Sequence, residues 1–432
     1  MERMASGPST PHWLESLLQD TSAAPTLFRW DTNNIPEVPP AERAVSSPIA
    51  NGGDERRRIH ILGLGNIGRL FAMSLSKLPD RPPITLVLHR KALLGHWRSN
   101  PGVEIIRGAV TERSDDFDVE LWSEEPPESG PVREVETIQN LVVATKAPDA
   151  LLQVDRLRRY LGPTSTVVFT QNGMNRLWPP HGAAYSRERF SRDGHPSWLA
   201  CVVTHGVTSL GPFRSLLASP ADAVVGPILV NRIAADATRH LLDQIEAAPD
   251  LAGRSVSTTE LWVLQLEKLV VNSIINPLTA VLRCKNGVLF AEPEGDIVNL
   301  IDILLFEASH VLQRLVQHQS TECIVRSADG EARAGLSTEA LLRRFSFPNL
   351  RAMLHRVGDK VRDNTSSMLQ DVLVGKRTEV REFNGWLVET AQFLGADLDV
   401  GSHEILAGLV DRGVVLEKSR LGKYFPALLH LR

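Results

Sequence analysis

Residues 58–68 read RIHILGLGNIG, a short apolar run that ends in glycines with the spacing G-x-G-x-x-G. The apolar run predicts a buried strand, and the apolar residues at helical spacing that follow it predict a helix. Between the two, Gly63 would permit a tight turn, Gly65 would let a pyrophosphate approach the backbone, and Gly68 would let the helix pack closely on the strand. The stretch therefore predicts a nucleotide-binding unit, with a glycine turn of purely structural use as the alternative. The residues expected to contact the cofactor here are Gly63, Leu64, Gly65, Asn66, Ile67 and Gly68.

Strand and helix patterns continue to alternate downstream of this turn. Buried strands are predicted at 84–90, 138–147 and 165–173, with a helix at 148–162 between the last two. Such alternation indicates a parallel, doubly wound sheet. After about residue 257 the strand patterns stop, and the sequence predicts helices at 258–282, 293–317, 337–345, 349–374, 378–395 and 403–412. The expected fold is α/β, with an N-terminal Rossmann-type doubly wound parallel sheet followed by an all-α C-terminal domain.

The end of the second predicted strand indicates which nicotinamide cofactor the chain binds. NAD-binding domains carry an Asp or Glu at this place, where it holds the ribose 2′-OH. This chain has His89, Arg90 and Lys91 instead. An arginine suits a 2′-phosphate, which it can bind through two parallel hydrogen bonds. We therefore expect NADPH rather than NADH, with Arg90 on the 2′-phosphate; an ordinary solvated strand end is the alternative.

The composition argues against several classes of protein. Lys and Arg number 47 against 51 Asp and Glu, a formal net charge of −4, so the chain has no basic excess to neutralise a nucleic acid. The cysteines have no metal-type spacing and suit a reducing compartment, and no apolar run approaches the ~20 residues that span a bilayer. We expect a cytoplasmic protein without nucleic-acid, membrane or metal partners. Glu2, Glu15 and Asp20 count against a mitochondrial transit peptide, which stays the alternative.

Three parts of the chain are expected. Residues 1–55, with many Pro, Ser and Asn, read as a partly disordered extension, in which residues 11–20 could form a short amphipathic helix that docks on the body. Residues 56–257 form the predicted NADP-binding Rossmann domain, and residues 258–432 form the predicted helical domain that binds substrate and carries catalysis. Within the Rossmann domain, the acidic segment 101–137 reads as a solvated insertion with short strands.

Sequence signals mark the start of the helix predicted over 258–282 and a bend within it. The run STTE places Ser257 at the N-cap, with Glu260 reaching back from the third helical position. Pro277 removes a backbone donor and is expected to bend the helix.

This helix carries a polar stripe in a segment that is otherwise rich in Val, Ile and Leu. Lys268, Asn272 and Asn276 recur every four residues. Four residues turn about 400°, so the three side chains lie along one face. Because a buried ammonium or amide without a partner is strongly unfavourable, this face must meet something polar. Our interpretation is a small anionic substrate, with the lysine supplying charge and a proton; a structural network with carbonyls of a neighbouring helix is the alternative.

Together these motifs resemble those of the ketopantoate reductases (2-dehydropantoate 2-reductases), in segments over about residues 58–412. GLGNIG resembles the family's dinucleotide turn, ATKA with Lys146 its strand-end lysine, and QNGM with Asn172 its asparagine–glycine turn. The runs KLVVNSIINPLTAVLRCKNG and NTSSMLQDVLVGKRTEVREFNG resemble its two substrate-site segments.

The resemblance implies a role for each matching residue. Lys268 would be the general acid that protonates the ketone oxygen as hydride arrives, and Glu379 the acid that orients the substrate hydroxyl and the lysine. The residues expected to bind the substrate are Asn172, Asn272, Asn276 and Asn286 and, on its carboxylate, Asn364 and Ser367. The residues expected at the cofactor, besides the glycine turn, are Arg90, Lys146 and Asn172. The alternatives are a solvated helix face for Glu379 and a helix-capping hydroxyl for Ser367.

The implied reaction is the NADPH-dependent reduction of 2-dehydropantoate to (R)-pantoate, a step of pantothenate and coenzyme A biosynthesis. Two alternatives stay open: an NADPH reductase of another small oxo acid, and a non-catalytic family member that acts as a binding scaffold in an organelle. Relatives that pair through their helical domain suggest a homodimer. The chain departs from the family's pattern at Gly401 and His403, where a Pro and an Asn are common, and in the extension 1–55 and the insertions 101–137 and 318–348.

Replacing Lys268 by Ala is expected to lower turnover by orders of magnitude while NADPH still binds, because the ammonium supplies the proton and lies outside the nucleotide turn. Turnover and NADPH binding would be measured on the same preparation. Loss of NADPH binding together with turnover would instead assign Lys268 to the stability of the fold.

Overall fold

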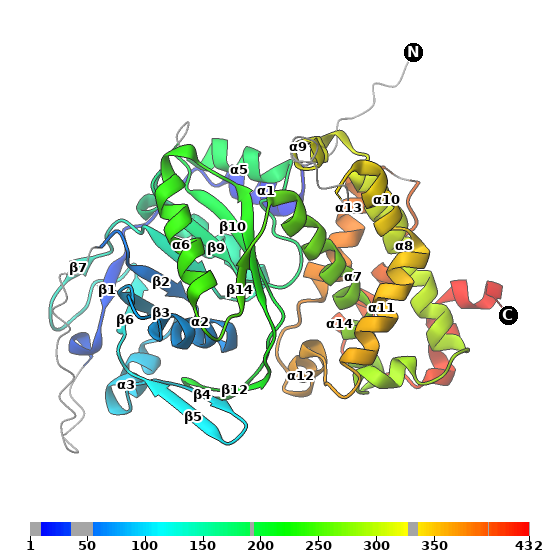
Figure 1. The fold of residues 1–432 in the computed structure, drawn as a ribbon, viewed down its shortest axis with the longest axis horizontal. Coiled ribbons are helices and arrows are strands. Elements are labelled where there is room, and N and C mark those ends of the chain that lie inside the picture. Colours follow the sequence, from blue (N-terminus) through cyan, green and yellow to red (C-terminus); the bar gives the residue numbers. More distant parts are fainter. Residues whose placement is uncertain (1–9, 36–54, 191–193, 327–335, 396, 432) are drawn as a thin grey trace, which may run out of the picture. The chain divides into compact units, whose positions relative to one another are not determined.

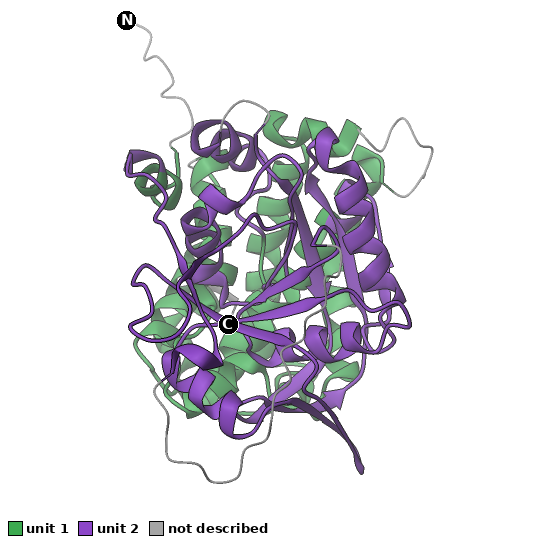
Figure 2. Ribbon diagram, turned by 90° about the vertical axis from the view of Figure 1, so that its left-hand side faces the viewer, with its two compact units in different colours: residues 1–17, 172–174, 262–432 green, residues 18–171, 175–261 purple. Residues whose placement is uncertain are grey.

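The computed structural model describes residues 10–35, 55–190, 194–326, 336–395 and 397–431. The chain forms two compact units (Figure 2). The sheet unit consists of residues 18–171 and 175–261, and the helical unit consists of residues 1–17, 172–174 and 262–432. The turn 172–174 begins three residues after the end of a strand of the sheet unit, yet it belongs to the helical unit.

Within the described residues, the sheet unit is built around a ten-stranded sheet (Figure 1). Its strands, in spatial order, are β14 (Gly253–Ser255), β13 (Ala223–Leu229), β10 (Ser197–Val203), β9 (Thr166–Phe169), β8 (Asn140–Val143), β2 (Ile59–Leu62), β3 (Ile84–Leu88), β6 (Asp118–Ser123), β1 (Phe28–Trp30) and β7 (Arg133–Glu134). From β10 to β6 all neighbours pair in parallel, which confirms the predicted doubly wound sheet at its centre. Antiparallel pairs extend it at both edges, between β10 and β13 and between β6, β1 and β7.

Side chains of successive strand residues point to opposite faces of a sheet. Every residue of β3, β8 and β9 is buried, so both faces of this sheet are covered. Ile59 and Ile61 of β2 belong to a core on one face, to which α2, α3 and α6 contribute. Phe169 of β9 and Trp198 of β10 lie on the opposite face, where the indole ring also meets Tyr185 of α5. The helices of this unit are α2 (Asn66–Ser76), α3 (Lys91–Ser99), α4 (Ala147–Arg156), α5 (His181–Arg189) and α6 (Ala235–Ala247).

The segment 101–137 is more than the solvated insertion predicted from the sequence. Its strand β6 pairs in parallel with β3 and is an interior strand of the main sheet. Acidic residues in and around β6 obscured the strand pattern. One of those within the strand, Glu120, is buried and paired with Arg29 at 2.7 Å. Burial raises the pKa of Glu120. Strand β7 of the segment pairs with β1 at the edge of the main sheet. The strands β4 (Val103–Arg107) and β5 (Val110–Ser114) join a second, four-stranded sheet in the order β11 (Gly206–Gly211), β12 (Arg214–Ser219), β4 and β5.

Part of the N-terminal extension is folded. The amphipathic helix expected there is present as α1 (His12–Gln19), which buries Leu14 and Leu17. The strand β1 also comes from the extension and lies between β6 and β7. Residues 1–9 and 36–54, on which the expected disorder bears, lie outside the described residues.

The helical unit consists of helices and connecting segments in its described residues. Its helices are α7 (Thr258–Leu282), α8 (Asp296–Val316), α9 (Glu322–Arg326), α10 (Thr338–Arg344), α11 (Phe347–Lys360), α12 (Ser367–Leu373), the π-helix η6 (Arg381–Gly385), α13 (Trp386–Leu394), α14 (Gly401–Asp411) and α15 (Leu421–Tyr424). The predicted bounds of α7 are confirmed. The single helix predicted over 349–374 is wrong, because the polar residues between α11 and α12 compete with the backbone for hydrogen bonds and Ser366 caps α12. None of the described helices is long and apolar enough to cross a membrane.

A buried carboxylate of α8 caps the start of α14. The two oxygens of Glu307 accept hydrogen bonds from the backbone N–H groups of Ser402 (3.1 Å) and His403 (3.2 Å). These are groups that a helix start leaves without intrahelical partners. The His403 ring is buried as well, and its Nε2 donates to the Leu304 carbonyl at 3.0 Å. Burial raises the pKa of Glu307 to about 7 and lowers the pKa of His403 to about 4.

The raised pKa of Glu307 predicts a pH dependence of stability. Because its folded pKa of about 7 lies above its ordinary value of 4.5, the folded chain holds a proton that the unfolded chain has lost between these values. The stabilisation is therefore full below pH 4.5 and is lost as the pH rises through 7, a fall of roughly 2–3 kcal/mol in the free energy of unfolding.

Urea unfolding of wild type and Glu307→Gln at pH 5 and pH 7.5 would measure this contribution. The glutamine cannot ionise, so the variant is expected to lose less stability than wild type between the two pH values. Equal losses in the two proteins would contradict the assignment to Glu307.

Candidate active site

The glycine turn between β2 and α2 has little room for side chains at two of its three glycines. Gly63 has a φ of +93°, and a Cβ there would lie 2.8 Å from the backbone nitrogen of Thr145. A Cβ on Gly68 would lie 2.2 Å from the Gly63 carbonyl oxygen. At Gly65, by contrast, the nearest such atom is 4.0 Å away, so the surface outside the start of α2 is open. Open space over exposed backbone N–H groups at a helix start fits a pyrophosphate.

Arg69 stabilises this turn through hydrogen bonds, a role that the sequence analysis did not predict. Its buried guanidinium donates to the Leu64 carbonyl at 3.1 Å and to the Arg214 carbonyl at 2.6 Å. Burial lowers the pKa of Arg69 to about 10. The Asn66 side chain likewise donates to the Val207 carbonyl at 3.1 Å. The signal for Arg69 was available, since a charged residue stands in the otherwise apolar first turns of the helix.

The ends of β8 and β9 are tied together next to the glycine turn. Gln171 donates to the carbonyls of Val143 (2.8 Å) and Thr145 (3.0 Å). Lys146 is exposed at the N-cap position of α4. The Thr145 hydroxyl is buried and lacks a hydrogen-bond partner among the described residues. A buried hydroxyl of this kind, at the carboxyl ends of parallel strands, fits a bound nucleotide that would supply its partner.

The polar stripe of α7 is present as predicted on one continuous helix. Lys268 and Asn272 are half-buried, and Asn276 is 8% exposed. The side-chain amides of the two asparagines make no hydrogen bond within the part of the chain that the structure describes. At the start of the helix, Ser257 accepts a hydrogen bond from the Glu260 backbone N–H at 3.3 Å, as a cap does.

Pro277 creates an attachment point on α7. A proline cannot donate to the carbonyl four residues earlier, which here is that of Ser273. The side-chain amide of Asn384, on the π-helix η6, donates to this carbonyl at 2.9 Å. Asn384 is fully buried and also bonds to Nδ1 of His403 at 2.9 Å. The π-helix is thereby fastened to α7 within the polar stripe.

The turn 172–174 lies against the segment that carries Glu379. The Asn172 side-chain amide donates to the Glu379 carboxylate at 3.4 Å. Gly173 has a φ of +85°, and a Cβ there would lie 2.8 Å from the Glu382 carbonyl oxygen. Two predicted site residues that are far apart in the sequence are thus neighbours, and glycine is the residue that permits the approach.

Asn286 has a structural task in addition to any role toward a ligand. Its side-chain amide donates to the Val361 carbonyl at 3.2 Å, and its backbone N–H donates to the Asn364 carbonyl at 3.1 Å. Its side-chain oxygen is buried without a partner among the described residues. Asn286 therefore holds the segment 361–364 in place, whereas the Asn364 side chain is exposed.

Of the two serines at the start of α12, Ser366 is the cap. Ser366 accepts a hydrogen bond from the Leu369 backbone N–H at 3.1 Å. Its hydroxyl also bonds to the Thr279 hydroxyl of α7 at 2.7 Å. Ser367 is not the helix-capping hydroxyl that was its alternative reading: it is exposed as the first residue of α12. Since Thr279 follows Asn276 by three residues, α12 starts beside the end of the polar stripe.

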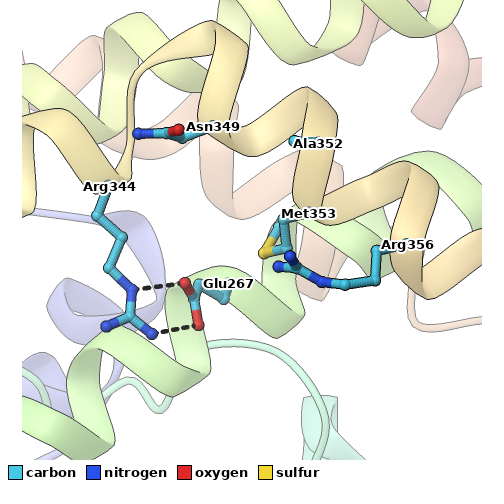
Figure 3. A pocket seen from close by; sticks show the side chains of 6 residues that line it. All are labelled: Glu267, Arg344, Asn349, Ala352, Met353 and Arg356. Atoms are coloured by element: carbon cyan, nitrogen blue, oxygen red, sulfur yellow. Dashed lines mark hydrogen bonds and ion pairs between the residues drawn. The ribbon is translucent and has the colours of Figure 1, made fainter.

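A cavity of about 280 Å³ lies between α7, α10 and α11 in the helical unit (Figure 3). Its lining residues are Glu267, Arg344, Asn349, Ala352, Met353 and Arg356. Arg344 binds the Glu267 carboxylate through two hydrogen bonds of 2.6 and 2.9 Å. Glu267 adjoins Lys268 in sequence, but neighbouring helix residues point about 100° apart. None of the predicted substrate residues lines this cavity, so we do not assign it to the substrate.

Two family models match the chain. The model described as "Ketopantoate reductase PanE/ApbA" matches residues 59–229, and the model described as "Ketopantoate reductase PanE/ApbA C terminal" matches residues 260–412. The first covers the glycine turn and most of the sheet unit. The second covers the polar stripe of α7, Glu379 and the start of α14.

Proteins that are named as reductases are similar to this chain. The chain is 41% identical to "Ketoisovalerate reductase" of Beauveria bassiana, over 96% of this chain and 99% of the relative. It is 28% identical to "Probable 2-dehydropantoate 2-reductase" of Schizosaccharomyces pombe, over 84% of this chain and 96% of the relative. A solved structure of D-mandelate dehydrogenase with NADH and anilino(oxo)acetate has a TM-score of 0.61 at 14% identity, over 84% of this chain and 99% of the other. That last likeness concerns the fold alone.

Replacing Asn384 by Ala is expected to destabilise the chain by about 1–3 kcal/mol, because the Ser273 carbonyl is left without a partner in the interior. Adding Pro277→Ala is expected to recover part of this loss, since an N–H at position 277 can bond to the same carbonyl. Urea unfolding of both variants, with Pro277→Ala alone as the control, measures the effect. Equal stability of the single Asn384 variant and the double variant would contradict this account.

Proposed function

Because this chain belongs to the ketopantoate reductase family, we propose that it reduces a small 2-oxo acid with NADPH. Membership makes it an oxidoreductase acting on a keto acid. The observation that carries the proposal is the polar stripe of α7, where the side-chain amides of Asn272 and Asn276 make no hydrogen bond to the described residues and Lys268 lies on the same face. A 2-oxo acid offers such a face a carboxylate and a ketone oxygen, both of which accept hydrogen bonds.

In the proposed reaction Lys268 is the general acid. A nicotinamide cofactor, when bound, supplies the hydride to the keto carbon. Negative charge then develops on the former ketone oxygen, where the Lys268 ammonium stabilises it and delivers a proton. The product is a 2-hydroxy acid, and the neutral lysine regains its proton from solvent. The half-buried position of Lys268 strengthens its attraction for the developing charge, because water screens it less.

The other predicted residues have positioning roles in this proposal. The hydrogen bond from Asn172 supports Glu379 as an oriented acceptor for a substrate hydroxyl or for the lysine. The exposed side chains of Asn364 and Ser367, near the end of the polar stripe, suit the substrate carboxylate. Asn286 reaches the same segment through the backbone of Asn364, so its contribution includes holding the carboxylate-binding residues in place.

The two candidate substrates differ in one group. 2-Oxoisovalerate has an isopropyl group beside the ketone, and 2-dehydropantoate has a hydroxymethyl group in addition. The relative named for ketoisovalerate is 41% identical, and that named for 2-dehydropantoate is 28% identical, so we propose 2-oxoisovalerate as the preferred substrate. Glu379 favours 2-dehydropantoate as the second candidate, because a carboxylate can accept a hydrogen bond from the added hydroxyl.

The proposal of NADPH rests on the residues after β3. Arg90 and Lys91 are exposed at the start of α3, and the strand ends without an acidic residue that would hold a ribose 2′-OH. Two cations suit a 2′-phosphate. The D-mandelate dehydrogenase of similar fold was solved with NADH, so fold alone does not decide between the cofactors.

Oxidation of NADPH by the purified protein, followed by absorbance, tests the substrate. We expect turnover of both acids, with kcat/KM higher for 2-oxoisovalerate, and weaker activity with NADH. A pocket that is apolar around the alkyl group discriminates against an added hydroxyl by at most about 100-fold, whereas a site built to bind that hydroxyl rejects the analogue without it by about 10⁴-fold or more. The ratio of kcat/KM for 2-oxoisovalerate to kcat/KM for 2-dehydropantoate therefore shows whether the pocket around the alkyl group is apolar or binds a hydroxyl.

Glu379→Gln provides the matched variant for this test. If Glu379 accepts a hydrogen bond from the hydroxymethyl group, the variant loses more activity on 2-dehydropantoate than on 2-oxoisovalerate. If Glu379 orients Lys268 instead, the activities on both acids fall by the same factor. Absence of turnover with either acid, in a protein that binds NADPH, would contradict the proposal and favour the binding-scaffold alternative.

A further inference from the structure

The N-terminal extension places an aromatic side chain beside the cofactor end of the sheet unit. The pairing registers set Trp30 of β1 opposite Leu121 of β6, and Leu121 opposite Leu88 of β3. Leu88 is the last residue of β3, and Arg90 and Lys91 follow it after one residue, His89. Trp30 therefore lies level with the carboxyl end of β3, two strand spacings or about 10 Å away.

The Lys91 ammonium makes a cation–π contact with the ring of Trp30. The Nζ atom of Lys91 lies 3.9 Å from the centroid of the indole ring, a distance at which a cation is attracted to the ring face. Trp30 itself is buried, and its Nε1 donates to the Glu125 carbonyl at 2.9 Å. The Lys91 side chain remains 53% exposed, with the Glu125 carboxylate 3.8 Å away. The ammonium is thus held in one place and stays accessible to a ligand.

Further contacts fasten the extension around α3. The 3₁₀ turn η1 (Thr32–Asn34) begins with a capping box at Asp31. Asn34 is buried, and its amide donates to carbonyls of the 129–131 loop at 2.8 and 3.0 Å. In the last turn of α3, Arg98 donates to the Ile35 carbonyl at 3.0 Å. The extension therefore contacts α3 near both ends, at Lys91 and at Arg98.

We propose that Trp30 is a positioning residue for the 2′-phosphate of the cofactor, an inference that rests on the NADPH preference proposed above. In a doubly wound sheet, the ribose of a dinucleotide bound at the glycine turn lies at the end of the second strand, which here carries Arg90 and Lys91. A lysine loses considerable rotamer freedom when it binds a phosphate. The indole ring of Trp30 restrains Lys91 beforehand, so that binding a 2′-phosphate costs less. The extension thus raises the selectivity for NADPH over NADH.

Binding of two probes to the full chain tests this role without catalysis. Adenosine 2′,5′-bisphosphate and 5′-AMP differ only in the 2′-phosphate, and calorimetry measures both affinities. Trp30→Leu is expected to weaken the bisphosphate about two- to five-fold and to leave 5′-AMP unchanged. Trp30→Phe keeps an aromatic ring and should retain most of the affinity. Phe28→Leu, an aromatic-to-leucine change two residues away on β1, is the matched control and should alter neither probe.

Lys91→Ala shows whether Trp30 acts through Lys91. This variant is expected to weaken the bisphosphate, and adding Trp30→Leu to it should cause no further loss, because the ring then has no ammonium to hold. The KM for NADPH should follow the same order, with kcat and the KM for NADH unchanged.

Four results would overturn the inference. Equal weakening of both probes by Trp30→Leu would make Trp30 a structural residue of the sheet. Additive losses in the double variant would separate Trp30 from Lys91. An unchanged affinity for the bisphosphate in Trp30→Leu, in a protein whose wild type prefers it over 5′-AMP, would reject the inference alone. Equal binding of both probes by the wild type would reject the NADPH preference and this inference together.

Discussion

One hydrogen bond joins the two segments of the helical unit on which the proposed chemistry depends. Pro277 leaves the Ser273 carbonyl without its helical partner, and the buried amide of Asn384 supplies a replacement from the π-helix η6. A carbonyl without a partner in the interior is costly, so η6 and α7 are held in a fixed relation. Glu379 lies two residues before η6, and its place relative to the polar stripe of α7 depends on this bond.

The polar residues of the helical unit fall into two groups, according to whether their side chains make hydrogen bonds to other described residues. Glu307, Ser366 and Asn286 bond to backbone groups of neighbouring segments and hold helix starts and loops in position. Asn272 and Asn276 make no such bonds in the described part of the chain, although Asn276 is almost fully buried. Polar side chains of the second kind are the ones that a ligand would satisfy. The sequence motifs contain both kinds, and only the structure separates them.

In the sheet unit the glycine turn depends on close backbone approach. The helix start packs on the strand end because Gly68 has no side chain to meet the Gly63 carbonyl, and Arg69 supports the turn from within. The N-terminal extension contributes the strand β1, which pairs with β6 and places Trp30 level with the carboxyl end of β3. The segments that looked accessory in the sequence, the extension and residues 101–137, together complete the sheet beside Arg90 and Lys91. That placement gives a structural reason for their presence.

The sequence predicted the features that depend on local order. Apolar periodicity and the Ser257 cap determine α7, and strand–glycine–helix order determines the nucleotide turn, because these patterns reflect hydrogen bonds between residues close in the chain. The sequence predicted short strands in the segment 101–137 but not that β6 is an interior strand of the main sheet, because its burial comes from β3 and from β1 of the extension. The bond between the hydroxyls of Ser366 and Thr279 could not be predicted, because the two residues lie 87 positions apart in the sequence.

The sequence by itself determined the family, which follows from contiguous motifs, and the fold class, which follows from the order of strand and helix patterns. The same motifs supplied the residues of the proposed site. Only the tertiary structure decided that Asn172 meets Glu379, that Asn384 completes the helix at Pro277, and that Trp30 lies over Lys91. Each of these contacts joins residues that lie far apart along the chain. Their partners are chosen by strand register and helix packing, which depend on the burial of the whole core and not on any local pattern.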